Sequence, residues 1–208
     1  MKILEPKVSK CIEYDFDTAT CENVFENMIF TNNIFGKKEI TNTTFDSCIF
    51  KKIDFNNINL NNVELIDVIF DNCDLSNKCF DRVLIQRVKF VNSKMYGISF
   101  IDSSIKDVQF ESCNARYINF ANARINKMIV TDSDFSEMCF QETEIKELEL
   151  NNTNLSKSEI SRTNLNNIDI STCKIDRVMI DNESLNGVII DRFQSMDLVG
   201  MLGVRIKE

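Results

Sequence analysis

The feature that most constrains this chain is a five-residue repeat of large apolar side chains. Every position whose number is a multiple of five, from Phe25 to Ile190, is apolar, and these 34 positions hold 14 Phe, 10 Ile and 7 Leu. The chain as a whole is only 43% apolar, and of its 16 phenylalanines only Phe16 and Phe193 lie off this grid. A spacing of five fits neither an α-helix nor an alternating strand, so an internal repeat must govern the fold.

A second signal lies two residues before each grid position. From Val88 onward this site alternates between bulky and small residues, so that bulky ones recur every ten: Val88, Ser93, Ile98, Ser103, Val108, Cys113, Ile118 and Ala123. The intervening positions are mostly Asn, Asp, Ser, Thr, Lys and Glu, which favour turns and water. Each five-residue unit therefore predicts one short extended side, with two inward residues, and one corner.

This pattern resembles the pentapeptide-repeat proteins. The segments CDLSN, residues 73–77, and TNLSK, residues 153–157, match the family consensus of a small or apolar residue, a polar one, Leu or Phe, and two variable residues. The resemblance covers about four fifths of the chain. It implies an all-β solenoid, a right-handed quadrilateral β-helix with four repeats per coil.

The unbroken grid leaves no place for a domain boundary or linker within it. We expect residues 1–190 to form the β-helix, with residues 1–24 as its N-terminal cap, and residues 191–208 to form a short C-terminal α-helix and strand. No apolar N-terminal run is long enough for a signal peptide or a membrane span. The expected location is the cytoplasm.

The chain lacks most of the residue types and motifs on which enzyme active sites are commonly built. The chain has no histidine, and none of its eight cysteines forms a C-x-x-C pair. Cys48, Cys73, Cys113 and Cys173 occupy the inward small site, which favours packed, reduced thiols over disulfides or a metal site. We expect no enzyme activity, no metal and no cofactor, and interpret the chain as a binding protein.

The formal charge of −8 argues against direct binding to nucleic acid, which needs a basic stripe. Acid residues concentrate within 18 positions that span almost one coil, where seven carboxylates face Lys146 alone. They predict an acidic belt around the rod, whose other explanation is solubility. The belt comprises Asp132, Asp134, Glu137, Glu142, Glu144, Glu147 and Glu149.

One wall of the predicted rod is nearly neutral and carries two outward tyrosines, Tyr96 and Tyr117, one coil apart. The two inward residues of the repeat beside Tyr117, Cys113 and Ala115, are both small, so less side-chain volume fills the core there. The pattern fits either a local dent flanked by the tyrosines or a simple packing irregularity.

After Ile190 the grid stops and a helical segment is predicted from Asp191, a candidate N-cap, to Leu202, with Gly203 as a candidate C-cap. Its apolar residues surround the helical wheel, so it must be covered on two sides. One side is expected to cap the open end of the rod, as solenoids require, and the other to join a second subunit. The predicted dimer-interface residues are Phe193, Met196, Leu198, Val199, Met201, Leu202, Val204 and Ile206, the last two in a short strand.

The tail, with Asn186-Gly187-Val188, Phe193-Gln194-Ser195 and Leu202-Gly203-Val204, closely resembles the tail of the Qnr quinolone-resistance family. YGISF, residues 96–100, resembles a mid-chain segment of that family. YDFDTATCENVF, residues 14–25, resembles its N-terminal cap, with one residue fewer before the grid. The resemblance implies an elongated dimer that mimics duplex DNA, binds DNA gyrase or topoisomerase IV and protects these enzymes from fluoroquinolones. Many members also carry two projecting loops, which this grid does not admit.

Two functions of different classes therefore stay open. The first is a topoisomerase-binding, DNA-mimicking protection protein, favoured by the acidic belt and the Qnr-like tail. The second is a structural or scaffolding rod of pentapeptide repeats with no topoisomerase partner.

Overall fold

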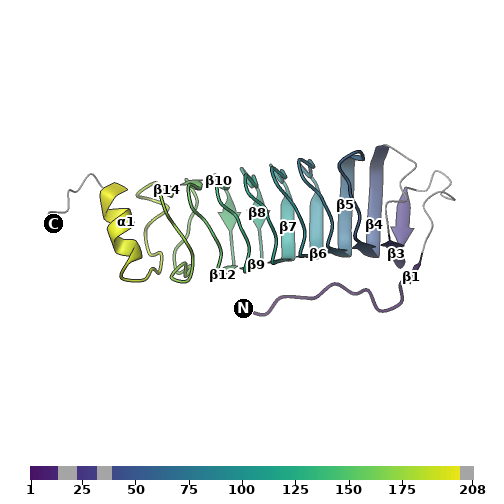
Figure 1. Cartoon of the computed structure of the whole chain (residues 1–208), viewed down its shortest axis with the longest axis horizontal. Coiled ribbons are helices and arrows are strands. Elements are labelled where there is room, and N and C mark those ends of the chain that lie inside the picture. The colour runs from purple at the N-terminus through teal and green to yellow at the C-terminus, as the bar shows by residue number, and fades with distance from the viewer. Residues whose placement is uncertain (14–22, 32–38, 202–208) are drawn as a thin grey trace.

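The computed structural model is an elongated rod in which the chain winds into successive coils, with a helix at the C-terminal end (Figure 1). It describes residues 1–13, 23–31 and 39–201. The helix, α1, is Gln194–Met201. The strands are β1 Ile12–Glu13, β2 Val24–Glu26, β3 Met28–Thr31, β4 Glu39–Lys51, β5 Asn59–Asp71, β6 Leu84–Val91, β7 Ser104–Glu111, β8 Arg124–Ile125, β9 Met128–Thr131, β10 Cys139–Gln141, β11 Glu144–Ile145, β12 Leu148–Asn151, β13 Glu159–Ser161 and β14 Met179–Ile180.

All strand pairs between coils are parallel and most join residues twenty apart, as Phe70 pairs with Phe90 and Phe90 with Phe110. Twenty residues hold four five-residue units, so each coil has four walls, and the predicted quadrilateral solenoid with a single short helix is confirmed. Grid residues define the walls: Phe45 and Leu65 lie on wall 1, Phe50 and Phe70 on wall 2, Phe55 and Leu75 on wall 3, and Leu60 and Phe80 on wall 4.

The corners between walls use left-handed backbone. The second residue after a grid position commonly has a positive φ, such as 55° at Asn72 and 49° at Asn92. Asn and Asp tolerate this conformation better than other residues with a side chain. The abundance of Asn and Asp in the chain is therefore partly a requirement of the corners.

Stacked aromatic rings fill the core. On wall 2, the rings of Phe70, Phe90 and Phe110 stack with centroids 5.1 and 5.0 Å apart and planes within 12° of parallel. The twenty-residue register produces these stacks, because it places identical grid positions of successive coils above one another. Each buried phenylalanine removes about 150–250 Å² of surface from water.

Small polar residues at the inward site tie successive coils together. The Ser103 and Thr143 hydroxyls donate to the carbonyl oxygens of Phe80 and Phe120, 2.6 and 2.9 Å away. The Cys48 thiol makes the same contact with the Phe25 carbonyl at 3.3 Å. Such bonds satisfy hydroxyl and thiol groups that would otherwise be buried at a cost.

The four cysteines predicted at the inward site, Cys48, Cys73, Cys113 and Cys173, are buried free thiols, as expected. Burial raises the pKa of Cys48 and of Cys73 to about 12 and that of Cys113 to about 11. Because the thiolate is the reactive form, these thiols are inert near neutral pH.

Helix α1 closes the C-terminal end of the rod. The Asp191 carboxylate accepts hydrogen bonds from the N–H groups of Phe193 and Gln194, and the Gln194 amide oxygen accepts one from Asp191 N–H, which confirms the predicted N-cap. The Gln194 amide NH2 donates to the carbonyls of Ile170 and Cys173, each at 2.8 Å. The Gln194 side chain therefore both takes part in the cap at the start of the helix and attaches the helix to the last coils. The predicted helix end, C-cap and short strand lie outside the described residues.

Residues 1–11 do not lie over the N-terminal end of the rod, although residues 1–24 were predicted to cap it; of the described N-terminal residues, Ile12 and Glu13 pair along that end. Residues 1–11 form a strap that runs along the corner between walls 1 and 2, back toward the middle of the rod (Figure 1). Leu4 N–H donates to Asp107 and Lys7 N–H to Asp67, before Ile12 pairs with Met28. Of the remaining predicted cap, residues 14–22 lie outside the described residues.

Asp67 makes the strap sensitive to acid. Burial disfavours the charged carboxylate, but hydrogen bonds from Arg87 and from Lys7 N–H, with the positive charge of Arg87, outweigh it and lower the pKa of Asp67. A lowered pKa stabilises the folded state above the unfolded pKa of about 3.9, and that stabilisation is lost as the pH falls through the folded-state pKa. Amide exchange at Lys7, corrected for its intrinsic pH dependence, should therefore accelerate as the pH falls below about 4. Asp67→Asn is expected to remove most of this change.

Candidate functional site

The seven residues of the predicted acidic belt do encircle the rod. They occupy outward positions on all four walls within slightly less than one coil: Asp132 and Glu149 on wall 2, Asp134 and Glu137 on wall 3, Glu142 on wall 4, and Glu144 and Glu147 on wall 1.

Five of these seven carboxylates, however, contact a cation. The partners lie one coil before or after, or in the strap, so a count along the sequence within the belt misses them. The expected charge of seven carboxylates against one lysine is therefore largely compensated. The ion pairs are Glu137–Arg116 at 2.6 Å, Glu142–Arg162 at 2.5 Å, Glu144–Arg124 at 3.4 Å, Glu147–Lys127 at 3.5 Å and Glu149 with the Met1 amino group at 2.9 Å.

The other two belt residues are bound to amides. Asp132 accepts a hydrogen bond from the Asn152 side chain and Asp134 one from Asn154, in each case from the next coil. Among the described residues, neither carboxylate forms an ion pair. The belt thus presents two uncompensated charges, on adjacent walls.

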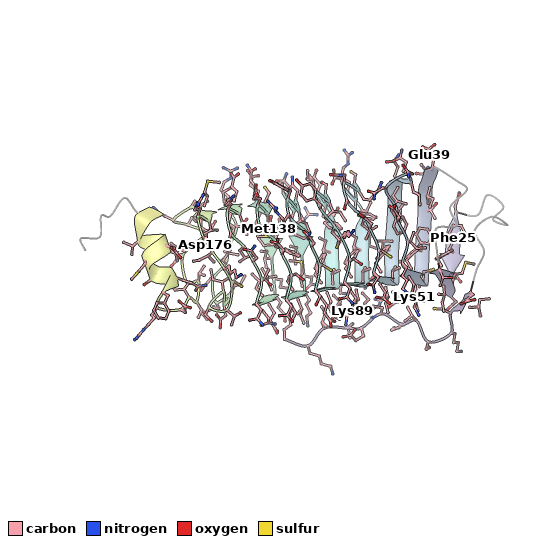
Figure 2. All side chains as sticks on the ribbon, viewed as in Figure 1. Phe25, Glu39, Lys51, Lys89, Met138 and Asp176 are labelled. Atoms are coloured by element: carbon pink, nitrogen blue, oxygen red, sulfur yellow. The ribbon has the colours of Figure 1, made fainter. Side chains whose placement is uncertain are left out.

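Sorting the outward residues by wall reveals a longer acidic surface on wall 4, which we call the acidic stripe. At its outward positions six carboxylates face two guanidinium groups, with the half-buried Lys78 at the edge toward wall 3, whereas the described outward positions of wall 3 hold five acids and five bases. Glu39, at one end of the stripe, lies on the opposite edge of the rod from Lys51 and Lys89 of wall 2 (Figure 2). The twenty-residue spacing could have revealed the stripe in the sequence. Its acids are Glu39, Asp81, Asp102, Glu142, Glu159 and Asp181, and its bases are Arg82 and Arg162.

An aromatic cluster lies on wall 3, where two outward tyrosines were expected. The half-exposed rings of Tyr96 and Tyr117 meet edge to face, with centroids 5.1 Å apart. The Arg116 guanidinium lies 5.4 Å from the Tyr117 ring centroid and pairs with Glu137. Hydrogen bonds from Tyr117 and Arg116 lower the pKa of Glu137, so this carboxylate is charged at neutral pH. The dent proposed beside the tyrosines stays a prediction.

The predicted dimer-interface residues divide into two groups. Phe193 and Met196 are 73% and 59% exposed, which is unusual for such large apolar side chains. Leu198 is 5% exposed and belongs to the core, so it caps the rod instead of facing a partner, and Val199 is half-buried. The side chains of Met201, Leu202, Val204 and Ile206 lie outside the described residues.

Within residues 1–13, 23–31 and 39–201, no group of three or more Cys, Asp or Glu side chains is arranged to hold a metal ion. No helix in these same ranges is both long and apolar enough to cross a membrane. The candidate functional surfaces are therefore the acidic stripe, the belt, the aromatic cluster and the exposed face of α1.

Comparison with known families matches the repeat itself. Residues 39–77 match the family model described as pentapeptide repeats (8 copies), and residues 63–132 match that of a pentapeptide repeat region. Pentapeptide repeats of this family therefore cover residues 39–132. No curated protein matches it in a sequence comparison.

Solved structures similar to this chain differ in their described roles. HetL, from the cyanobacterium Nostoc sp. strain PCC 7120, is involved in heterocyst differentiation regulation; it is 11% identical, with a TM-score of 0.40, over 80% of this chain and 89% of HetL. A trypsin-treated variant of QnrB1, a plasmid-mediated fluoroquinolone resistance protein, is 18% identical, with a TM-score of 0.37, over 94% of this chain and 96% of its own. Rfr23, from the cyanobacterium Cyanothece 51142, is 13% identical, with a TM-score of 0.29, over 59% and 90%. The shared repeat does not by itself select among such roles.

Proposed function

We propose that this protein binds a type II topoisomerase, DNA gyrase or topoisomerase IV, by presenting the acidic stripe of wall 4 in place of DNA, and that it thereby protects the enzyme from fluoroquinolones. The observation that carries the proposal is the excess of four negative charges at the outward positions of this one wall, from Glu39 to Asp181. The Qnr-like tail sequence supports the choice of partner.

The stripe would imitate DNA only sparsely. Seven coils separate its ends, and at about 4.8 Å per coil its six acids are spread over roughly 34 Å. Duplex DNA carries one charge per about 1.7 Å. The stripe therefore acts mainly by steering the rod toward a basic, DNA-binding surface, an attraction that salt screens.

The proposal includes a dimer joined through the exposed face of α1. Phe193 and Met196 offer apolar area that a second copy would cover, while Gln194 and Leu198 hold the helix on its own rod. Two rods joined tail to tail would double the length of acidic surface available to a two-fold symmetric enzyme.

The test uses three stripe acids that form no ion pair within the described residues. Glu39→Gln, Asp102→Asn and Glu159→Gln together remove three charges and keep side-chain size, and Asn suits the positive φ at Asp102. We expect gyrase affinity at low salt to fall by about tenfold or more, and protection from ciprofloxacin in a supercoiling assay to fall with it.

A matched control removes the same net charge from wall 1, with Glu26→Gln, Asp46→Asn and Glu64→Gln, and should bind like the parent. A third set, Asp132→Asn, Asp134→Asn and Glu147→Gln, tests the belt separately. Loss of binding in the belt set but not in the stripe set would move the contact to the belt.

The compensated belt favours a second candidate, a scaffolding rod without a topoisomerase partner. Five of its seven acids are occupied by cations of the same chain, as solubility and coil-to-coil cohesion alone would require. Absence of gyrase binding by the folded parent protein at low salt would establish this alternative over the first.

A further inference from the structure

The corner between walls 1 and 2 forms a groove lined by alternating charges. The outward residue at this corner changes sign from coil to coil along Asp67, Arg87, Asp107, Lys127 and Glu147. Arg87 holds Asp67 through two hydrogen bonds of 2.6 Å, and Lys127 lies 3.5 Å from Glu147. The strap lies along this row of charges.

The rod contacts the strap mainly through the strap's backbone. Leu4 N–H donates to the Asp107 carboxylate at 3.1 Å, and Lys7 N–H donates to that of Asp67 at 2.9 Å. In the opposite sense, the Lys127 ammonium donates to the carbonyl of Lys2 at 3.1 Å. Contacts of this kind recognise an extended backbone whatever its side chains.

The contacts repeat every three residues of the strap and every second coil of the rod. Three residues of polyproline II advance about 9.3 Å, with every third N–H on the same side. Two coils at strand spacing advance about 9.6 Å. The nitrogens of Lys7, Leu4 and Met1 accordingly meet Asp67, Asp107 and Glu149 in turn. The corner thus matches the period of a polyproline II segment.

The strap also accounts for the burial of two corner carboxylates. Asp67 and Asp107 are only 4% and 3% exposed, although both occupy outward corner positions. In the part of the chain that the structure describes, Leu4 N–H is the one hydrogen-bond donor to the Asp107 carboxylate. Because a buried charge must be hydrogen-bonded, Asp107 requires an N–H donor from whatever covers it.

Side chains add an apolar component. Ile3 and Pro6, each directly before a donating residue, are half-buried, while Leu4 and Lys7 are exposed. Half-buried isoleucines, Ile49, Ile69 and Ile129, occupy the outward position of wall 2 next to the corner. An occupant with an apolar residue before each donor therefore fits the groove.

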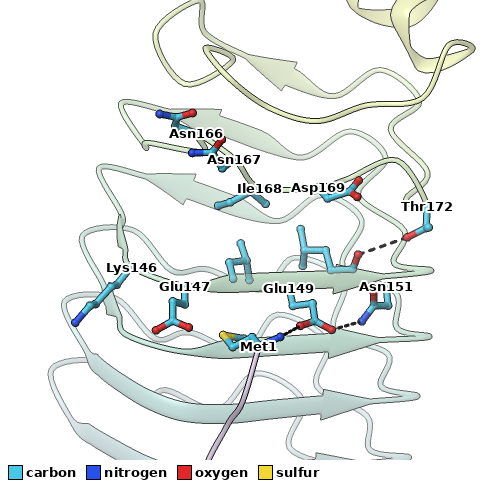
Figure 3. A pocket seen from close by; sticks show the side chains of 12 residues that line it. Met1, Lys146, Glu147, Glu149, Asn151, Asn166, Asn167, Ile168, Asp169 and Thr172 are labelled. Carbon is cyan, nitrogen blue, oxygen red and sulfur yellow. Dashed lines mark hydrogen bonds and ion pairs between the residues drawn. The ribbon is translucent and has the colours of Figure 1, made fainter.

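The groove continues beyond Met1 as an open cavity of about 550 Å³ (Figure 3). Glu149, which binds the Met1 amino group, lies at its near side, and Asn167 and Asp169 of the next coil line it further on. An occupant longer than the strap therefore has room to extend in the same direction.

We propose that this groove is a docking site for an extended, polyproline II segment of a partner protein, and that residues 1–7 are its built-in competitor. The partner segment supplies backbone N–H groups three residues apart to Asp107 and Asp67, with an apolar residue before each. The site lies at the corner between walls 1 and 2, whereas the acidic stripe lies on wall 4, so the site is independent of the proposed topoisomerase contact.

The test measures binding in trans with the full chain and a fluorescent peptide of residues 1–10. Leu4→Pro and Lys7→Pro together remove both donors from the strap, while proline itself favours a polyproline II backbone. This strap-released chain should bind the peptide at least about tenfold tighter than the parent, because its own competitor has lost two hydrogen bonds to charged groups. A peptide with proline at positions 4 and 7 should bind at least about tenfold more weakly than the unmodified peptide.

Glu5→Pro with Val8→Pro is the matched control in both chain and peptide, since neither N–H donates a hydrogen bond within the described residues. The control should behave like the parent. Equal binding of the two proline-substituted peptides, or no binding to a strap-released chain with an unchanged melting temperature, would overturn the proposal. If the double variant does not fold, the same binding measurement with the single variants Leu4→Pro and Glu5→Pro tests the proposal in the same way. Loss of a parent dimer on strap release, seen by light scattering, would reassign the groove to a second copy.

Discussion

Replacing Phe90 with aspartate is expected to abolish the cooperative folding of the rod. Phe90 is completely buried, between the parallel rings of Phe70 and Phe110. Truncating a buried phenylalanine alone costs about 3–5 kcal/mol, and an unpaired buried carboxylate adds several more. Together these costs approach the roughly 5–15 kcal/mol that stabilises a typical domain.

Circular dichroism during heating provides the measurement. Phe90→Leu, which keeps an apolar side chain, should melt cooperatively at a lower temperature than the parent, and Phe90→Ala lower still. A melting curve of Phe90→Asp that overlaid the parent curve would contradict the stacked core.

Deleting residues 191–208 should produce aggregate instead of a stable rod. The deletion removes Leu198 from the core and the Gln194 amide from the carbonyls of Ile170 and Cys173. The last coil would then expose its apolar interior and unpaired carbonyl groups, which solenoids avoid by capping. Size-exclusion chromatography with light scattering measures the outcome, and a well-behaved dimer of the shortened chain would refute the assigned interface.

A double substitution separates capping from dimerisation. Phe193→Ser with Met196→Ser changes only exposed side chains and leaves the Asp191–Gln194 capping interaction in place. We expect a monomer whose melting temperature at low concentration is that of the parent. A dimer of this variant would place the subunit contact away from the exposed face of α1.

The repeating part of the fold was predictable because its information is local. A grid residue such as Phe90 identifies its own wall by its number alone, and the twenty-residue coil places its neighbours, Phe70 and Phe110, without further information. Asp191 and Gln194, three residues apart, similarly identify the start of α1.

The electrostatic surface was predictable only by sorting charged residues by wall, and the path of the strap was not predictable from the repeat. Glu144 forms an ion pair with Arg124 of the neighbouring coil. A count of charges within the belt segment therefore predicted a charge that the folded rod largely compensates. Leu4 contacts Asp107, which is 103 residues away in the sequence, and the strap has no sequence repeat that would predict where it lies. The Glu144–Arg124 pair follows the same twenty-residue spacing as the core and could have been found in the sequence, whereas the position of the strap depends on which corner it meets, a relation that exists only after the coil has formed.

The twenty-residue coil also restricts how such a chain can change length. Removing one whole coil of twenty residues, such as residues 72–91, would leave every downstream residue on its own wall. Removing five would turn everything beyond that point by a quarter turn, and Asp102, Glu142 and Glu159 would pass from wall 4 to the neutral wall 3. The apolar grid would continue through either change, but removing five would also place the bulky inward residues, which recur every ten, against small ones of the preceding coil. A change of twenty residues would therefore preserve both the core and the charged walls, whereas a change of five would disturb the core and move the charges to another wall.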